Sequence, residues 1–287
     1  MVNNNNKITL IECPRDAMQG WPEYIPVQTK INYLNSLLKV GFDTIDFGSF
    51  VSPKAIPQLR DTTEVLKGLD LSGSDSKLLS IIANVRGAEE ALCFDEISYL
   101  GFPFSVSEEF QRRNANSTIL ESLKRVEEIQ NLCVIKNKQL VIYISMGFGN
   151  PYGEPWSAEI VITWVKRLAE NGIQRIALSD TIGVSNPENI THLFSNLIPE
   201  FSEVVFGAHL HSHPHNWKGK IIAAEKSGCR RFDSALKGIG GCPMADDELV
   251  GNLATENVVS YFGGPEILGL NSKFLDKSLI LANEIFH

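Results

Sequence analysis

The sequence has few cysteines, no long apolar run and no excess of positive charge. Its five cysteines form no Cys-x-x-Cys pair, and an odd, scattered set predicts reduced thiols in a cytosol-like compartment. No apolar run approaches the roughly 20 residues that a membrane-spanning helix needs. The first residues lack the apolar core of a signal peptide and the Arg-rich character of a transit peptide. We therefore expect a cytoplasmic protein without a membrane partner.

Basic residues are outnumbered by acidic ones, 26 to 34, which gives a formal net charge of -8. Nucleic-acid-binding proteins usually carry a basic patch, so this balance argues against a nucleic-acid partner. It does not exclude an anionic small substrate, which one local arginine could bind. With 43% hydrophobic residues in 287, the chain is long enough to bury one large core or two small ones.

Short apolar runs of β type alternate with longer amphipathic stretches along the chain. The stretches 27–40, 157–171 and 187–197 are predicted helices, and glycines at 41, 172 and 228 indicate turns from a helix into a strand. Eight strand–helix units in roughly 250 residues predict a (β/α)8 TIM barrel. The predicted strands are 8–11, 44–47, 78–83, 96–100, 140–145, 175–178, 204–209 and 230–232.

A doubly wound open sheet is the competing fold. The Gly-x-Gly-x-x-Gly fingerprint after a first strand is missing, which favours the barrel. We predict a single domain over 1–287, with the barrel at about 7–264 and a C-terminal extension at 265–287. The extension is expected to form an additional helix over 273–286, packed against the barrel.

Polar residues follow several predicted strands at their carboxyl ends. In a TIM barrel these ends meet at one mouth, where the active site lies. Residues more than 200 positions apart are therefore expected to converge. They are Arg15 and Asp16 after the first strand, Asp46 and Ser49 at the second, Asp180 and Thr181 after the sixth, His209 and His211 at the seventh, and Cys242 after the eighth.

His209 and His211 are two residues apart, so on a strand both side chains point to the same face. A lone strand histidine is more often a hydrogen-bonded core or surface residue. Two imidazoles on one face, with Asp16 across the mouth, instead form a ligand set suited to a divalent cation. His213 and His215 extend the series, but Pro214 breaks the strand, so they are left out of the predicted site.

Arg15 and Cys242 are the other two candidates for chemistry. Arg15 would by default form a surface ion pair, although its rigid fork of donors also suits a developing enolate. Cys242 lies in Gly-Ile-Gly-Gly-Cys-Pro, a glycine-rich stretch that is typical of a mobile loop rather than of core packing. For Asn252 the spacing leaves two interpretations open, a helix N-cap or a cation ligand.

At these residues the chain resembles 3-hydroxy-3-methylglutaryl-CoA lyase, within the metallolyase barrel family that includes isopropylmalate and homocitrate synthases. The resemblance runs from about Ile8 to Tyr261. The GGCP loop favours the lyase branch over the condensing synthases. The motifs are PRDAMQ (14–19), SFVSPK (49–54), SDTIGV (179–184), HLH (209–211), GIGGCPMA (238–245) and GNLATEN (251–257).

The resemblance implies an acyl-CoA substrate, a divalent cation (Mg²⁺ or Mn²⁺) and a homodimer. It implies that Arg15 stabilises the enolate and that Cys242 is an acid/base that delivers a proton to it. The base that takes the hydroxyl proton is His209 or Asp46. The implied cation ligands are Asp16, His209, His211 and Asn252, and the implied substrate-binding residues are Arg15, Ser49, Asn84, Asp180 and Thr181.

The chain departs from the usual lyase pattern at three places. Asp46 stands where the lyases usually have Glu, Ala17 where they have Gly, and Ser-His-Pro-His (212–215) where they run Asp-Thr-Tyr-Gly. The expected reaction is retro-Claisen cleavage of 3-hydroxy-3-methylglutaryl-CoA to acetyl-CoA and acetoacetate. The alternatives are a lyase or aldolase acting on a related 3-hydroxyacyl-CoA or hydroxy-acid, and a metal-binding homologue without catalytic activity.

Overall fold

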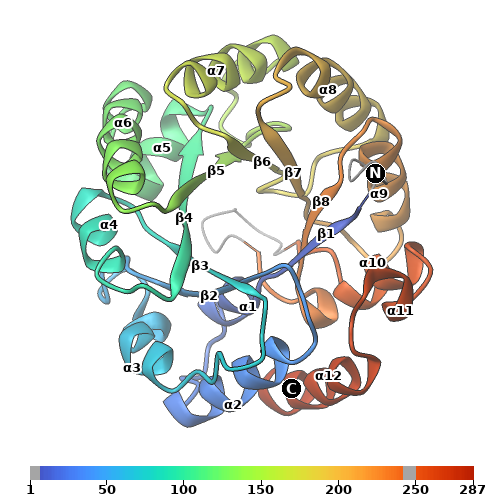
Figure 1. The fold of residues 1–287 in the computed structure, drawn as a ribbon. Helices are drawn as coiled ribbons and strands as arrows, with labels where there is room; N and C mark the ends of the chain where they lie inside the picture. Colours follow the sequence, from blue (N-terminus) through green and yellow to red (C-terminus); the bar gives the residue numbers. More distant parts are fainter. Residues whose placement is uncertain (1–6, 242–249) are drawn as a thin grey trace.

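Eight parallel strands close into a barrel in the computed structural model, which describes residues 7–241 and 250–287. Each strand pairs with the next along the chain, and β1 completes the ring by pairing with β8. Figure 1 shows the helices as an outer ring around the strands. The predicted TIM barrel is confirmed. The strands are β1 (Thr9–Glu12), β2 (Thr44–Ser49), β3 (Lys77–Ile81), β4 (Ile97–Ser105), β5 (Gln139–Ser145), β6 (Arg175–Ser179), β7 (Val205–His209) and β8 (Arg231–Ser234).

Helices surround the strands, and the longer ones bury one face against the barrel. In α7, for example, the fully buried Val161, Val165 and Leu168 recur every three or four residues, which is the helical period. The helices are α1 (Pro14–Gln19), α2 (Val27–Leu38), α3 (Thr62–Lys67), α4 (Val85–Ala91), α5 (Glu108–Ala115), α6 (Ile119–Ile135), α7 (Ala158–Glu170), α8 (Pro187–Glu200), α9 (Trp217–Lys226), α10 (Thr255–Tyr261), α11 (Pro265–Leu268) and α12 (Ser272–Ile285), with short 3-10 turns η2 (Pro57–Leu59) and η3 (Leu236–Gly238).

Three glycines stand between a helix and the next strand, where the sequence predicts them. Gly41, Gly172 and Gly228 have φ angles of 93°, 79° and 96°. A glycine adopts this left-handed conformation without the steric cost that a Cβ brings. The helix-to-strand turns before β2, β6 and β8 are therefore confirmed.

Strand β4 is longer than the sequence predicts, since it runs to Ser105 rather than to residue 100. The extra residues contain Gly101 and Pro103, two residue types that usually weaken a strand. A Cβ on Gly101 would lie 2.5 Å from Ile81 Cδ1 and 3.1 Å from Tyr143 Cε2. The glycine therefore makes room inside the barrel for side chains of β3 and β5.

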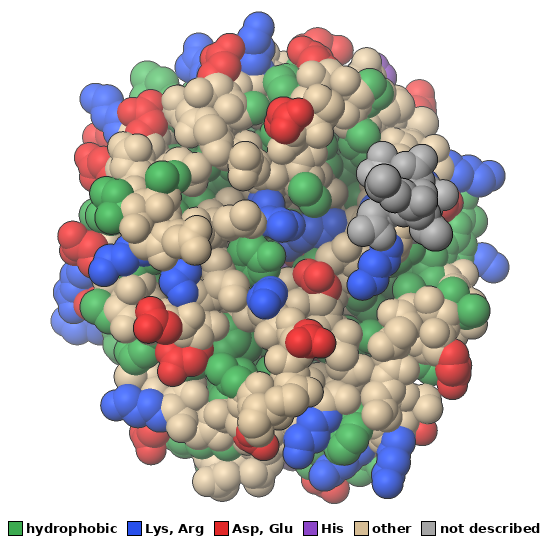
Figure 2. Space-filling model, in the orientation of Figure 1, with side chains coloured by type: hydrophobic (Ala, Val, Ile, Leu, Met, Phe, Trp, Pro, Cys, Tyr) green, Lys and Arg blue, Asp and Glu red, His purple; other side chains and the backbone are tan. Residues whose placement is uncertain are grey.

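The distribution of surface charge agrees with a sequence that has no excess of positive charge. On the face that Figure 2 shows, acidic and basic side chains are interspersed rather than gathered into fields of one sign. Within residues 7–241 and 250–287, none of the helices combines the length and the apolar character that crossing a membrane requires.

The C-terminal helix α12 packs beside α2, as Figure 1 shows. Ser278 Oγ donates to Ser36 Oγ at 2.8 Å between the two helices. Just beyond α12, the ring of Phe286 meets Trp21 edge-on with centroids 5.3 Å apart, and it also contacts Tyr33. The helix expected over 273–286 is therefore confirmed, and it covers the side of the barrel where α1 ends.

Replacing Phe286 with alanine should lower the free energy of unfolding by about 3–5 kcal/mol, because a buried aromatic ring is lost from this contact. Ile280→Ala, on α12, is the matched control in the same C-terminal segment. Ile280 is 58% exposed, so its truncation should change stability by less than about 0.5 kcal/mol. Urea unfolding of the two variants and the parent measures both values. A loss in Phe286→Ala as small as the one expected for Ile280→Ala would contradict a stabilising role of the Phe286 contact.

Candidate active site

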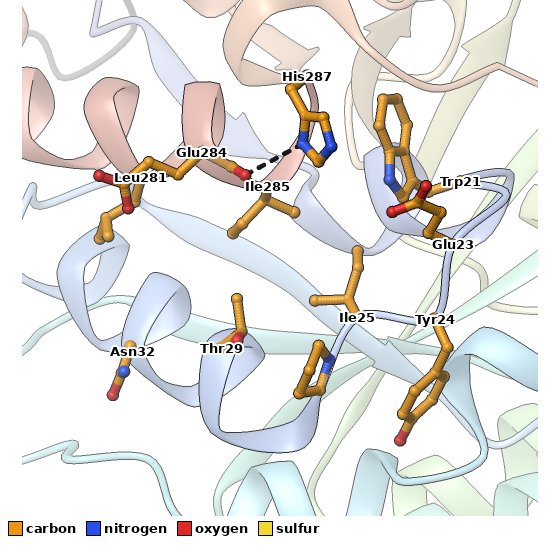
Figure 3. Close-up of a pocket in the computed structure, with 11 residues that line it drawn as sticks. Trp21, Glu23, Tyr24, Ile25, Thr29, Asn32, Leu281, Glu284, Ile285 and His287 are labelled. Atoms are coloured by element: carbon orange, nitrogen blue, oxygen red, sulfur yellow. Dashed lines mark hydrogen bonds between the residues drawn. The ribbon is translucent and has the colours of Figure 1, made fainter.

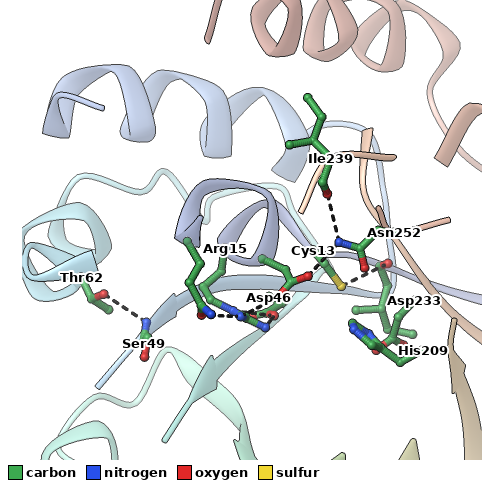
Figure 4. A network of polar contacts seen from close by, with 12 residues as sticks. Cys13, Arg15, Asp46, Ser49, Thr62, His209, Asp233, Ile239 and Asn252 are labelled. Carbon is green, nitrogen blue, oxygen red and sulfur yellow. Dashed lines mark hydrogen bonds and ion pairs between the residues drawn. The ribbon is translucent and has the colours of Figure 1, made fainter. Parts of the chain in front are cut away.

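Arg15 and Asp16 lie at the carboxyl end of β1 because α1 begins directly after that strand. Arg15 Nε lies 3.2 and 3.0 Å from the two oxygens of Asp46, and its Nη2 donates to Oδ2 at 2.6 Å. Its Nη1 donates to Asp16 Oδ1 at 2.8 Å and to Gln19 Oε1 at 2.9 Å. Figure 4 shows Arg15 beside Asp46. A guanidinium has five donors, so one Nη2–H has no acceptor within residues 7–241 and 250–287.

Asp16 is shared between this network and the C-terminal part of the chain. Its Oδ1 accepts from Arg15, and its Oδ2 accepts from Asn252 Nδ2 at 2.7 Å. Burial alone would raise the pKa of Asp16, but the charges of Arg15, His209 and His211 outweigh burial and lower the pKa below its usual range. The carboxylate is therefore ionised and suited to a cation.

His209 and His211 converge with Asp16 as predicted. One ligand atom from each of the three residues lies within 4.8 Å of the other two, and the imidazole centroids are 5.4 Å apart. Burial, followed by the charge of His209, lowers the pKa of His211 to about 4. Neither ring nitrogen of His211 has a hydrogen-bond partner of normal geometry among the described residues.

A buried imidazole with two unpartnered nitrogens is costly unless it receives a ligand. A neutral imidazole is also the form that binds a metal ion. The donor set of one carboxylate and two imidazoles therefore fits a divalent cation, and the three residues form a candidate metal-binding site.

Asn252 lies beside this cluster and does not cap a helix. Helix α10 begins at Thr255 and its N-cap is Ala254, which removes the capping interpretation. Asn252 Nδ2 donates to Asp16 and to Ile239 O at 3.0 Å. Its carbonyl oxygen is therefore the atom left for a cation.

The glycine-rich segment before Cys242 runs against the site. Gly240 has a φ of 106°, and a Cβ there would lie 2.5 Å from Asn252 Nδ2 and 2.9 Å from Asp16 O. Only glycine fits this approach. Cys242 itself lies outside the described residues.

Asp46 is 1% exposed at the second strand end. Burial raises its pKa to about 6, although the charge and hydrogen bonds of Arg15 oppose the shift.

Ser49 and Thr181 are buried hydroxyls at strand ends. Ser49 Oγ accepts from Val51 N at 3.2 Å, and Thr181 Oγ1 accepts from Met146 N at 2.8 Å. Because each hydroxyl uses a lone pair for a backbone amide, its own proton is left to donate within the part of the chain that the structure describes.

Asn84 and Asp180 make structural contacts. Asn84 is the N-cap of α4, where its Oδ1 accepts from Gly87 N at 2.9 Å. Asp180 Oδ1 accepts from Ser185 N, and its Oδ2 accepts from Ser185 Oγ at 2.5 Å and Lys220 Nζ at 2.7 Å.

Two buried polar neighbours of the cluster were missed by the sequence reasoning. Lys220 is buried and donates to His211 O at 2.7 Å as well as to Asp180. Asp233 Oδ2 lies 3.2 Å from His209 Nδ1. For Asp233 a signal existed, because Arg231 and Asp233 alternate on β8 as charged residues that point to one face. For Lys220 no local signal distinguishes it from other helix lysines.

A separate cavity of about 350 Å³ lies between the segment that follows α1, helix α2 and the end of α12. Figure 3 shows its lining, including the contact of His287 Nδ1 with Glu284 O. None of the residues of the Arg15–Asp16–His209–His211 cluster lines it. The chemistry is therefore placed at the barrel mouth and not in this cavity.

Known proteins match the chain over most of its length. It is 34% identical to hydroxymethylglutaryl-CoA lyase YngG of Bacillus subtilis over 254 residues, which is 88% of this chain and 84% of that one. It is 33% identical to the cytoplasmic 3-hydroxy-3-methylglutaryl-CoA lyase of Homo sapiens over 262 residues, 90% of this chain and 68% of that one.

Solved structures agree with these matches. An HMG-CoA lyase from Acinetobacter baumannii, in complex with coenzyme A and 3-methylmalate, superposes with a TM-score of 0.90 at 31% identity, covering 100% of this chain and 94% of that one. The HMGL-like family model matches residues 8–271. The chain therefore belongs to the HMGL-like family.

Proposed function

We propose that this chain is a metal-dependent carbon–carbon lyase that cleaves 3-hydroxy-3-methylglutaryl-CoA to acetyl-CoA and acetoacetate. The observation that carries the proposal is the cluster of Asp16, His209 and His211 beside the Arg15 guanidinium at the barrel mouth. Relatives at 30–34% identity that bear the name of this lyase support the same reaction.

Asp16, His209 and His211 are the residues that would hold the cation, with the Asn252 carbonyl oxygen as the fourth ligand. A bound divalent cation lowers the pKa of a hydroxyl group that it coordinates. Two imidazoles with a carboxylate and an amide oxygen suit several divalent ions, and the resemblance to the lyases favours Mg²⁺ or Mn²⁺ among them.

Asp46 is the base that we favour for the hydroxyl proton. His209 is the other candidate, but its Nδ1 lies 3.2 Å from Asp233 Oδ2 and its Nε2 would bind the cation. The pKa of Asp46, about 6, is close to the value at which a general base works well near neutral pH. Removal of the proton allows the C–C bond to break, so the hydroxyl carbon becomes the ketone of acetoacetate.

Arg15 stabilises the other product. The electron pair of the broken bond moves onto the thioester and places charge on its oxygen. The guanidinium is fixed by Asp46, Asp16 and Gln19 and keeps one Nη2–H for that oxygen. A donor that is already in place costs no reorganisation when the charge develops.

Cys242 then delivers a proton to the enolate carbon, which gives acetyl-CoA. The described chain reaches Gly241, and Gly240 is already in contact distance of Asp16. The GGCP motif, which the chain shares with the lyases, supports this role for Cys242.

Ser49 and Thr181 bind the free carboxylate of the substrate in this proposal, because each has a hydroxyl proton left to donate. Asn84 and Asp180 support the site through the contacts described above. The enzyme is further proposed to be a cytoplasmic homodimer.

A related 3-hydroxyacyl-CoA is the second candidate substrate. The segment after His211 differs from the usual lyase pattern, and the rings of His213 and His215 stack there with centroids 5.5 Å apart at 6°. Product analysis over a panel of acyl-CoA esters separates the two substrates.

Removal of the metal should abolish catalysis. We expect acetyl-CoA release from 3-hydroxy-3-methylglutaryl-CoA with Mg²⁺ or Mn²⁺, none with EDTA, and recovery when the cation is returned. Chromatography of the CoA products measures all three. Lack of cleavage in protein with a bound cation would overturn the proposed substrate, and cleavage that survives EDTA in metal-free protein would overturn the role of the cation.

Cys242→Ser should reduce kcat by about 10²–10⁴, the usual contribution of a positioned acid, while Mn²⁺ affinity stays unchanged. Cys93→Ser is the matched control, because Cys93 is exposed. Steady-state kinetics and Mn²⁺ titration measure both properties. Parent-like turnover in Cys242→Ser would remove its chemical role.

The pH dependence of kcat/KM should follow the protonation of Asp46. Its pKa is raised to about 6, so kcat/KM should fall as the pH drops through that value and the carboxylate takes up its proton. The same raised pKa means that Asp46 favours folding most at low pH, and that this contribution is lost as the pH rises towards 6. Asp46→Asn should lose the acid limb along with most activity, whereas Asp43→Asn, at an exposed position before the same strand, should keep the parent profile. An unchanged acid limb in Asp46→Asn would contradict this assignment.

A further inference from the structure

Two charged side chains from β8 lie inside the barrel, next to His209. Arg231 is 4% exposed and Asp233 is 1% exposed. They are two residues apart on the strand and therefore share a face. Arg231 Nη1 lies 3.2 Å from Asp233 Oδ1, and Asp233 Oδ2 lies 3.2 Å from His209 Nδ1. Figure 4 shows Asp233 beside the imidazole.

The neighbouring strand leaves room for this arginine. Gly207 of β7 pairs in register with Arg231. A Cβ on Gly207 would lie only 2.2 Å from Arg231 Nη1 and 3.1 Å from its Cδ. The guanidinium therefore occupies the volume that a side chain at position 207 would take.

Stability does not explain this arrangement. A buried ion pair pays a desolvation penalty that often exceeds its Coulombic gain. Here the geometry is incomplete, because Arg231 Nη1 and Asp233 Oδ1 lack a hydrogen bond of normal geometry among the described residues. Apolar side chains fill other inward positions of the barrel, such as Leu79 and Val141.

The contact with His209 indicates what the Arg231–Asp233 pair does. A carboxylate accepts but does not donate, so the nitrogen that faces it carries the imidazole proton. We infer that Arg231 and Asp233 are positioning residues, which hold His209 with its proton on Nδ1 and its Nε2 lone pair directed to the cation site. Tyr143 supports the ring from the side, with its centroid 5.5 Å from that of His209 at 81°.

This inference rests on the proposed cation site, and Asp233→Asn tests it at nearly constant shape. The cationic Arg231 guanidinium lies 3.2 Å from Oδ1, so in the variant the amide oxygen rather than the amide NH₂ stays beside Arg231. The amide NH₂ then faces His209 Nδ1. Because the amide NH₂ is a donor, His209 Nδ1 must accept from it, and the imidazole proton moves to Nε2. Nε2 is the nitrogen that would bind the cation.

We therefore expect Asp233→Asn to weaken Mn²⁺ binding by about 10–100-fold, the usual effect of losing such a partner. The measurement is a Mn²⁺ titration of metal-free protein followed by electron paramagnetic resonance. Asp61→Asn is the matched control, because Asp61 forms a buried pair with Lys30 at 2.8 Å and lies among the residues of α2 and α3. It should lower the melting temperature and leave the Mn²⁺ affinity unchanged.

The protonated nitrogen of His209 can be read directly. In metal-free protein with ¹⁵N-labelled histidine, the ring ¹⁵N shifts should show the proton on Nδ1 in the parent and on Nε2 in Asp233→Asn. The His209→Gln spectrum assigns the signals. A merely structural role for Asp233 predicts no change of tautomer.

Gly207→Ala disturbs the arginine without altering a charge or a ligand. It should weaken Mn²⁺ binding, whereas Gly219→Ala should not, because a Cβ there meets only Pro187 Cγ at an ordinary 3.4 Å. Parent-like Mn²⁺ affinity in Asp233→Asn and Gly207→Ala would overturn the inference and leave the proposed cation site intact. Failure of the parent to bind Mn²⁺ would overturn the cation site itself, and the inference with it.

Discussion

The rest of the site depends on the contacts of the Arg15 guanidinium. It joins Asp46 on β2 to Asp16 on α1, and Asp16 in turn accepts from Asn252 near the C-terminal end of the barrel. All four side chains are buried, so the charges of Arg15, Asp16 and Asp46 are stabilised by one another rather than by water. The same contacts keep Asp16 ionised beside the two histidines, which links the folding of three distant segments to the binding of a cation.

Strand periodicity made most of this site predictable. His209 and His211 share a face because side chains on a strand alternate. Arg15, Asp16, Asp46 and the histidines converge because parallel strands of a barrel end at one mouth. The eight strands and the terminal helix could also be located from apolar runs and turn glycines, although Gly101 and Pro103 concealed the second half of β4.

Other features depend on three-dimensional neighbours that no local pattern reveals. The ring orientation of His209 depends on Asp233, and the backbone of His211 is held by Lys220 from α9. Gly207 looks like any strand glycine until the Arg231 guanidinium is found in its place. Asn252 could be an N-cap or a ligand by sequence, and only the start of α10 at Thr255 decides against the cap.

The central claim is that Asp16, His209 and His211 bind one divalent cation at the mouth of the barrel. Crystals grown with Mn²⁺ would test it through the anomalous scattering of the ion. The account predicts one strong peak within bonding distance of Asp16, His211 and Nε2 of His209, with the Asn252 carbonyl oxygen turned towards it. A peak bound elsewhere, or none in a crystal whose barrel mouth is clearly resolved, would contradict it.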